Sequence, residues 1–543
     1  MMLMMKRILI CFILLVLLLA PVSCGSPPQE TGGNVIYFAK QTSGSVQQQI
    51  LGPLNETWEN NRWITRFKEK LGVDVKYSWL VDQSQYFEKL SLMMSKGELP
   101  DVFIVDTNRF YSLYKAGLLK NLDGLFEQYA SDDLKAYFAD AGQEMWDAVT
   151  VDGHLYGIPN LYSPLDRLQY LWIRTDWLKN LNLSEPKNFH DVLDIAQAFT
   201  ERDPDRNGKK DTFGFGVRGR PDIWREYYSF TGLFYGLGGM VPRITLDESG
   251  KVTKSEISNA NKKALEKIVA LYAEGIIDPY FSTITDQQVT EAIAQNKIGM
   301  FFGEHWVPQA ILSSVYEQAV KTNPDFEWKA FPIYDMNGEY AKQNIPLPCN
   351  GWFVVNKDYQ KPETLIRMLN VFLETAREDP EFYMDNEHVK SIWAISPVSL
   401  LSYKANVEIY DKANAVLDGQ TGYGDVTRDI KTMVDILKKW EEEKSPKSWG
   451  ISVIYGKGGA IGVLKEYLAQ GVPYPPDYYY EIPETAANFG GVLDQIRDQY
   501  YLDVILGKKK ISDYDNYVSQ WLSSGGQLML DDLNELYKDN KPQ

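Results

Sequence analysis

The sequence predicts an α/β protein that folds into two or three domains. At 543 residues the chain is too long for one hydrophobic core, and its 44% hydrophobic content is that of a folded protein. Beyond the N-terminal region, strand patterns over 35–38, 73–79 and 102–105 alternate with helical patterns over 58–71 and from residue 82. Strands that alternate with helices pair in parallel through right-handed crossovers, so this order predicts an α/β fold.

Residues 1–23 have the pattern of a bacterial signal peptide. Lys6 and Arg7 precede 13 consecutive apolar residues over 8–20, a run too short to span a bilayer. The next residues, PVSCG, resemble the lipobox of bacterial lipoproteins, with proline where leucine is usual. We expect Cys24 to become the lipidated (palmitate-bearing) N-terminus, and 24–33 to form a flexible tether. The alternative is a secreted protein with an incidental cysteine.

Cysteine content and net charge limit the cellular compartment and the classes of binding partner that we expect. Of three cysteines, Cys11 leaves with the signal peptide and Cys24 would carry lipid, so Cys349 has no partner for an internal disulfide. We therefore expect a protein anchored on the outer face of the cell membrane. The net charge of -17 argues against nucleic acid as a partner.

The middle of the chain continues the alternation of elements. A two-residue turn at 152–153 predicts a hairpin, and strands are predicted over 168–174 and 213–217, with a helix over 188–200 between them. No internal repeat is visible, and no membrane-spanning pattern follows the signal peptide.

An aspartate-rich loop follows the helix at 188–200. Oxygen-bearing side chains occupy loop positions 1, 3, 5 and 9, and a glycine at position 6 allows a sharp turn. The predicted ligands are the side chains of Asp203, Asp205, Asn207 and Asp211 and the carbonyl of Lys209. We expect a structural Ca²⁺ ion here, although position 12 is Gly214 and not the usual chelating glutamate. The alternative is a polar connecting loop.

The stretch KIGMFFGEHW over 297–306 is a buried strand that ends in polar and aromatic side chains. In open α/β sheets, ligands bind beyond the carboxyl ends of strands. Trp306 can stack on the C–H face of a sugar ring while Glu304 bonds to its hydroxyls. The alternative is a core tryptophan beside a salt-bridged glutamate. Further on, the sequence predicts a strand over 351–356, a long helix from Pro362 and helices near the C-terminus.

Several of these segments together resemble a known family. LPDVFIVD, DGHLYGIP, LQYLWIRTDWL, KIGMFFGEHW and GWFVVNKDYQKPETLIRMLNVFL resemble extracellular solute-binding proteins of carbohydrate ABC importers, of the large Gram-positive lipoprotein type. The aspartate-rich loop is similar to that of calcium-containing alginate-type oligosaccharide binders. The resemblance implies a two-lobe periplasmic-binding-protein-like fold with a hinge and an interlobe cleft.

The resemblance also implies domain boundaries and ligand contacts. We expect lobe 1 over 34–158 and 308–378, lobe 2 over 159–307 and 379–500, and a C-terminal helical segment over 501–543. The family's stacking tryptophan falls on Trp306, next to Glu304. Further ligand contacts are expected, from their positions in ligand-contacting segments, at Asp106, Tyr162, Trp224, Trp352 and Trp393.

Three function classes compete. The first is a monomeric binding protein without catalytic activity that delivers an oligosaccharide to the transmembrane subunits of an ABC transporter. The second is an anchored glycoside hydrolase or lyase, which needs a second carboxylate or a Tyr/His base opposite Glu304. The third is a peptide or lipid binder, which would need an apolar pocket without the Trp-plus-carboxylate pattern. We expect the first.

Overall fold

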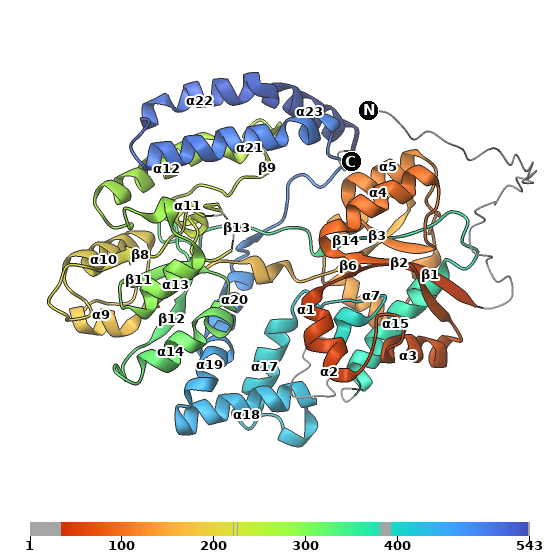
Figure 1. The fold of residues 1–543 in the computed structure, drawn as a ribbon, viewed down its shortest axis with the longest axis horizontal. Helices are drawn as coiled ribbons and strands as arrows, with labels where there is room; N and C mark the ends of the chain where they lie inside the picture. Colours follow the sequence, from red (N-terminus) through yellow and green to blue (C-terminus); the bar gives the residue numbers. More distant parts are fainter. Residues whose placement is uncertain (1–33, 221, 225, 380–381, 383–391, 541–543) are drawn as a thin grey trace, which may run out of the picture.

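The computed structural model describes residues 34–220, 222–224, 226–379, 382 and 392–540. Two β-sheets, each covered by helices, form two lobes (Figure 1). The α/β class predicted from the alternation of elements is therefore confirmed. No helix of the described ranges is long and apolar enough to cross a membrane.

The first lobe is built on a five-stranded sheet of order β2-β1-β3-β14-β6. Its strands are β1 (Val35–Thr42), β2 (Asp74–Asp82), β3 (Val102–Val105), β6 (Gly157–Leu161) and β14 (Cys349–Val355). The strands β1, β2 and β3 are parallel, and β14 runs antiparallel to both β3 and β6. Helices α3 (Arg62–Leu71) and α15 (Glu363–Glu378) cover one side, and α4 (Tyr86–Lys96) and α5 (Thr107–Lys115) the other (Figure 1).

The second lobe is built on a four-stranded sheet of order β12-β7-β11-β8. Its strands are β7 (Tyr170–Arg174), β8 (Phe213–Phe215), β11 (Ile298–Gly303) and β12 (Trp328–Phe331). Every residue of β7 and β11 is buried, because both faces of this sheet are covered. Phe302 faces one hydrophobic cluster and Phe301 the other, as the alternation of side chains along a strand requires.

Two groups of helices cover these faces. The helices α10 (Phe189–Glu201), α12 (Asn259–Ala273) and the C-terminal α21 (Glu484–Ile505), α22 (Tyr514–Trp521) and α23 (Gln527–Asn540) contribute to the Phe302 cluster. The helices α17 (Ala405–Leu417), α18 (Arg428–Glu443), α19 (Trp449–Tyr455) and α20 (Ala460–Ala469) contribute to the Phe301 cluster. Figure 1 shows α21 lying alongside α12.

The strand pairing differs from the expected division into lobes. The strand β12 was expected in lobe 1, but it pairs with β7 in the second sheet. Residues 392–400 were expected in lobe 2, but Ile392, Ile395, Val398 and Leu400 belong to the first-lobe core. The expected separate segment 501–543 is, in its described part, packed into the second lobe. These differences arise because the lobe boundaries depend on contacts between strands and helices that lie far apart in the sequence.

Within the described residues, three crossing segments join the lobes: residues 162–169, 345–348 and 401–404. They are hydrogen-bonded to one another or to the ends of neighbouring strands. The Tyr162 N–H donates to the Pro348 carbonyl (3.0 Å), and the Leu401 N–H donates to the Leu161 carbonyl (3.2 Å). The crossings therefore lie side by side as one hinge region.

Candidate ligand-binding site

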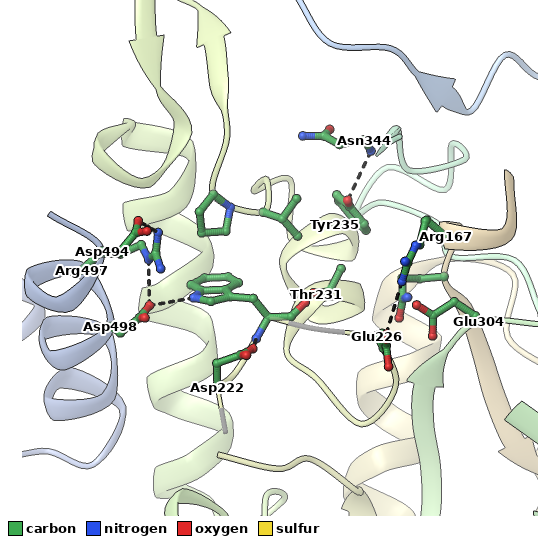
Figure 2. A pocket seen from close by; sticks show the side chains of 14 residues that line it. Arg167, Asp222, Glu226, Thr231, Tyr235, Glu304, Asn344, Asp494, Arg497 and Asp498 are labelled. Carbon is green, nitrogen blue, oxygen red and sulfur yellow. Dashed lines mark hydrogen bonds and ion pairs between the residues drawn. The ribbon is translucent and has the colours of Figure 1, made fainter. Parts of the chain in front are cut away.

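A cavity of about 780 Å³ opens in the second lobe beside the hinge region, and we call it the second-lobe cavity. Five separate parts of the chain line it: the first crossing, the segment 222–242, the residue after β11, β13 (Gln343–Asn344) and α21. Its charged lining residues are Arg167, Asp222, Glu226, Glu304, Asp494, Arg497 and Asp498 (Figure 2). Trp224, Thr231 and Tyr235 add aromatic and hydroxyl groups.

Glu304 lies directly after β11, where the strand delivers it to the cavity. Its side chain is only 1% exposed, and its Oε2 atom has no hydrogen-bond partner among the described residues. Burial raises the pKa of Glu304 to about 8, and the nearby Glu226 carboxylate adds to the rise while Arg167 opposes it. At neutral pH this carboxyl is mostly protonated and can donate as well as accept a hydrogen bond.

An ion pair lies near Glu304. Arg167 Nη1 is 3.3 Å from Glu226 Oε1, with side chains 51% and 42% exposed (Figure 2). Glu226 has a φ of 47°, in the left-handed region that residues other than glycine rarely adopt. Tyr162, at the start of the first crossing, is half-buried, and burial raises its pKa while the adjacent Arg167 opposes the rise. Tyr162 therefore lies near this pair, although it does not line the cavity.

Trp224 forms the aromatic part of the wall. Its Nε1 donates to Asp498 Oδ1 (3.0 Å), and its ring packs against Phe234 and Tyr501. Arg497 Nε donates to the same Asp498 oxygen (2.8 Å). The predicted ligand residues Trp224 and Glu304 are thus brought together in one cavity.

Sequence reasoning missed the contribution of α21. Asp494, Arg497 and Asp498 have the i, i+3, i+4 spacing that places side chains on one face of a helix. That spacing was the available signal. It did not reveal that this face would meet Trp224, which lies more than 250 residues earlier in the chain.

Trp306 is half-buried and does not line the second-lobe cavity. Its ring meets Tyr227 edge to face, with centroids 5.5 Å apart. The neighbouring His305 is buried, its Nε2 lies 3.3 Å from the Asn406 amide, and burial lowers its pKa. The stacking role of Trp306 stays a prediction.

A second cavity of about 730 Å³, the first-lobe cavity, lies at the carboxyl ends of β1, β3 and β6. Asp106 and Trp393, both predicted ligand residues, line it together with Trp58 and Lys40. Asp106 is also the N-cap of α5: one carboxylate oxygen accepts the Arg109 N–H (2.8 Å), and the other pairs with the Arg109 guanidinium.

Trp352 lies in the first-lobe core and not at a cavity. It is 2% exposed, and its Nε1 lies 3.4 Å from Thr107 Oγ1. The last four residues of β14, 352–355, are all buried in this core, because both faces of the strand are covered there. This placement makes Trp352 a packing residue and not the ligand contact that its position in the sequence suggested.

The aspartate-rich loop has part of the geometry of a cation site. The two carboxylate oxygens of Asp203 accept the N–H groups of Asn207 and Gly208, each at 3.0 Å. The Asn207 amide nitrogen lies 2.8 Å from an Asp205 oxygen and 3.1 Å from an Asp211 oxygen, so the three side chains converge. Burial raises the pKa of Asp205, and the Asp203 and Asp211 carboxylates add to the rise.

The fit to calcium is partial. Within the described residues, no group of three or more His, Cys, Asp or Glu side chains is arranged to hold a metal ion. However, Asp205 Oδ1 is buried without a hydrogen-bond partner in the described structure. A Cβ at Gly214 would lie 2.6 Å from the Ala196 carbonyl, so glutamate does not fit at position 12.

Comparison with known proteins agrees with this architecture. Residues 55–376 match the family model described as bacterial extracellular solute-binding protein. The chain is 24% identical over 488 residues to lipoprotein LipO of Bacillus subtilis strain 168, covering 87% of each protein. It is 23% identical over 535 residues to the polygalacturonan/rhamnogalacturonan-binding protein YtcQ of the same organism, covering 94% of this chain and 97% of that protein. The fold is similar to the crystal structure of alginate-binding protein AlgQ2 without calcium ion, with a TM-score of 0.54, 17% identity, and coverage of 94% and 99%.

Proposed function

Because this chain belongs to the family of bacterial extracellular solute-binding proteins, we propose that it captures an oligosaccharide outside the cell and delivers it to the permease of an ABC importer. The observation that supports an oligosaccharide ligand is the second-lobe cavity, which the Trp224 indole lines together with carboxylate and guanidinium groups. An indole suits the C–H face of a sugar, and charged groups suit its hydroxyls. The names of YtcQ and AlgQ2 support a carbohydrate ligand.

The same proposal excludes turnover of the bound sugar. A glycoside hydrolase needs a second carboxylate free to act opposite its acid. Glu226, the carboxylate that raises the pKa of Glu304, is paired with Arg167. Of the other carboxylates in the cavity, Asp494 and Asp498 are paired with Arg497, and Asp222 accepts the Trp224 N–H. In this proposal Glu304 therefore holds a sugar hydroxyl and does not protonate a leaving group.

Tryptophan variants test the binding site. We expect Trp224→Ala to lower the affinity for an oligosaccharide at least about tenfold, because stacking on an aromatic side chain is lost. If Trp306 also stacks on the sugar, Trp306→Ala lowers affinity and barely changes the melting temperature. If Trp306 is instead a packing residue, the variant loses about 3 kcal/mol of stability and keeps its affinity.

The measurements are isothermal titration calorimetry and thermal melting on the same proteins. Trp440→Ala is the matched control, since Trp440 is a half-buried tryptophan of α18 that lines neither cavity. An affinity that Trp224→Ala leaves unchanged would contradict the proposed site.

We also propose that the aspartate-rich loop binds a structural Ca²⁺ ion. Asp203, Asp205, Asn207, Asp211 and the Lys209 carbonyl would hold it. The support is the convergence of three side chains and the unpartnered Asp205 oxygen. The ion would neutralise carboxylates that otherwise repel one another, so its contribution is to stability and not to binding chemistry.

We propose finally that the protein is a monomer held on the outer face of the membrane by a lipid on Cys24. Cys24 lies outside the described residues, so the support is the lipobox-like sequence and the similarity to LipO. Anchoring would keep the loaded protein close to the transmembrane subunits of the importer.

A further inference from the structure

We propose that the second-lobe cavity selects oligosaccharides without acidic groups and discriminates against those that carry uronate carboxylates. This inference rests on the proposed function and adds the chemical class of the ligand. Five carboxyl groups line the cavity, against two guanidinium groups. The carboxyl groups belong to Asp222, Glu226, Glu304, Asp494 and Asp498.

Both guanidinium groups already have carboxylate partners in the protein. Arg167 pairs with Glu226 at 3.3 Å. Arg497 is only 7% exposed and binds the carboxylates of Asp494 and Asp498, and its Nη1 also lies 3.9 Å from Glu256 Oε1. A uronate at Arg497 would have to displace a protein carboxylate, and a uronate at the partly exposed Arg167 would compete with Glu226 and face the remaining negative charge.

Glu304 can bind a sugar hydroxyl in either protonation state. It is buried at the cavity wall, and its Oε2 has no partner among the described residues. A sugar hydroxyl can satisfy this atom by donating to it or by accepting from it. A uronate oxygen can only accept, so it would require Glu304 to keep its proton, and ionised Glu304 would repel it. With a pKa of about 8, Glu304 keeps its proton near neutral pH, so there the discrimination comes from the other four carboxyl groups of the cavity.

The first-lobe cavity does not offset the excess of carboxyl groups in the second-lobe cavity. Its charged lining residues are Lys40 and Asp106, one of each sign. The Lys40 ammonium donates to the Ser396 carbonyl at 2.6 Å, and burial lowers its pKa to about 8. Taken together, the two cavities therefore keep an excess of carboxylates.

Calorimetric titration of the purified mature protein with two sets of oligosaccharides tests the inference. The neutral set contains malto-, cello-, xylo-, arabino-, galacto- and fructo-oligosaccharides, and the acidic set contains oligogalacturonides, alginate oligosaccharides and glucuronoxylan fragments. We expect a neutral sugar to bind and its uronate-substituted counterpart to bind at least about tenfold more weakly. An acidic sugar that binds as tightly as the best neutral sugar would overturn the inference and leave the proposed function standing. Absence of binding by both sets would contradict the proposed function itself.

A charge-matched pair of variants locates the discrimination. Glu226→Gln releases Arg167 at the cavity, so we expect the ratio of neutral to acidic affinity to fall at least about threefold, and most at low salt. Glu266→Gln removes the same charge from an exposed position on α12 and should leave the ratio unchanged. An unchanged ratio in Glu226→Gln, or an equal fall in Glu266→Gln, would show that the cavity charges do not select the ligand.

Discussion

Burial decides the chemistry of Glu304. The sequence places this glutamate after an apolar strand, and the fold then encloses it at the cavity wall with one oxygen unpartnered among the described residues. Its pKa of about 8, against an ordinary value of 4.5, means that the carboxyl stays protonated over a range where a solvent-exposed glutamate is ionised.

This shift predicts how stability depends on pH. Between about pH 4.5 and pH 8, unfolding releases the Glu304 proton. As the pH rises through this range, the free energy of unfolding therefore falls by up to about 1.4 kcal/mol per pH unit because of this residue. Below that range both states hold the proton, and above it neither does. Glu304→Gln removes this contribution, so its stability relative to the natural protein should rise from pH 5 to pH 8. Urea denaturation of both proteins at several pH values measures this difference in the free energy of unfolding.

Exposed Glu266 provides the control for this prediction. The stability of Glu266→Gln should depend on pH in parallel with that of the natural protein, because this side chain is exposed. If the Glu304→Gln profile is also parallel, Glu304 is not held protonated in the folded protein.

At the scale of elements, the aspartate-rich loop shows what a local motif can and cannot predict. The residue types and their spacing were visible, as was the glycine at position 6, which adopts a φ of 78°. The reason for the missing glutamate was not visible, because the space at Gly214 is limited by the main chain of α10. A local pattern specifies which residues can be metal ligands, but the packing of a neighbouring helix decides whether a large side chain fits at a given loop position.

Calcium removal tests this loop. We expect saturating Ca²⁺ to raise the melting temperature, with a stabilisation of about 2.7 kcal/mol at a concentration of 100 times Kd. Asp205→Asn should abolish the response, since it removes the carboxylate with the unpartnered oxygen. Differential scanning calorimetry of metal-free and calcium-loaded protein measures both effects.

The turn at Asp247 supplies a matched control. Asp247 accepts hydrogen bonds from Ser249 and Lys251 in an exposed turn outside the aspartate-rich loop. Asp247→Asn should keep the full calcium response whatever its own effect on stability. Identical melting curves with and without calcium, in protein shown to be metal-free, would exclude the site.

At the scale of the whole molecule, three crossings join two lobes, and both candidate cavities lie beside elements that lead into these crossings. Arg167 belongs to the first crossing, and Leu401 to the third. A ligand that contacts both lobes would therefore also contact the segments about which the lobes can move. This arrangement suits a protein that takes up and releases its ligand.

The membrane anchor is also a property of the whole molecule. We expect the natural protein in the membrane fraction and Cys24→Ala in the soluble fraction, because the acyl chains supply the membrane affinity. Cys349→Ala is the control and should stay in the membrane fraction, since Cys349 is a partly buried residue of β14. Cell fractionation with immunoblotting measures this, and a Cys24→Ala protein that remains in the membrane pellet would contradict the anchor.

The sequence by itself determined the α/β class and the position of Glu304. Periodic apolar residues specify strands and helices locally, so the alternation from β1 to β3 and the buried strand β11 could be read directly. The resemblance to solute-binding proteins agrees with the family that the chain belongs to. Trp224 and Glu304, both expected at the ligand, line one cavity.

Only the tertiary structure decided which distant residues meet. The pairing of β12 with β7, the contact of α21 with Trp224 and the burial of Trp352 all depend on segments far apart in the sequence. Periodicity tells which face of an element is buried but not which partner covers it. For the same physical reason, the charges of the second-lobe cavity, drawn from five parts of the chain, became visible only when the chain was folded.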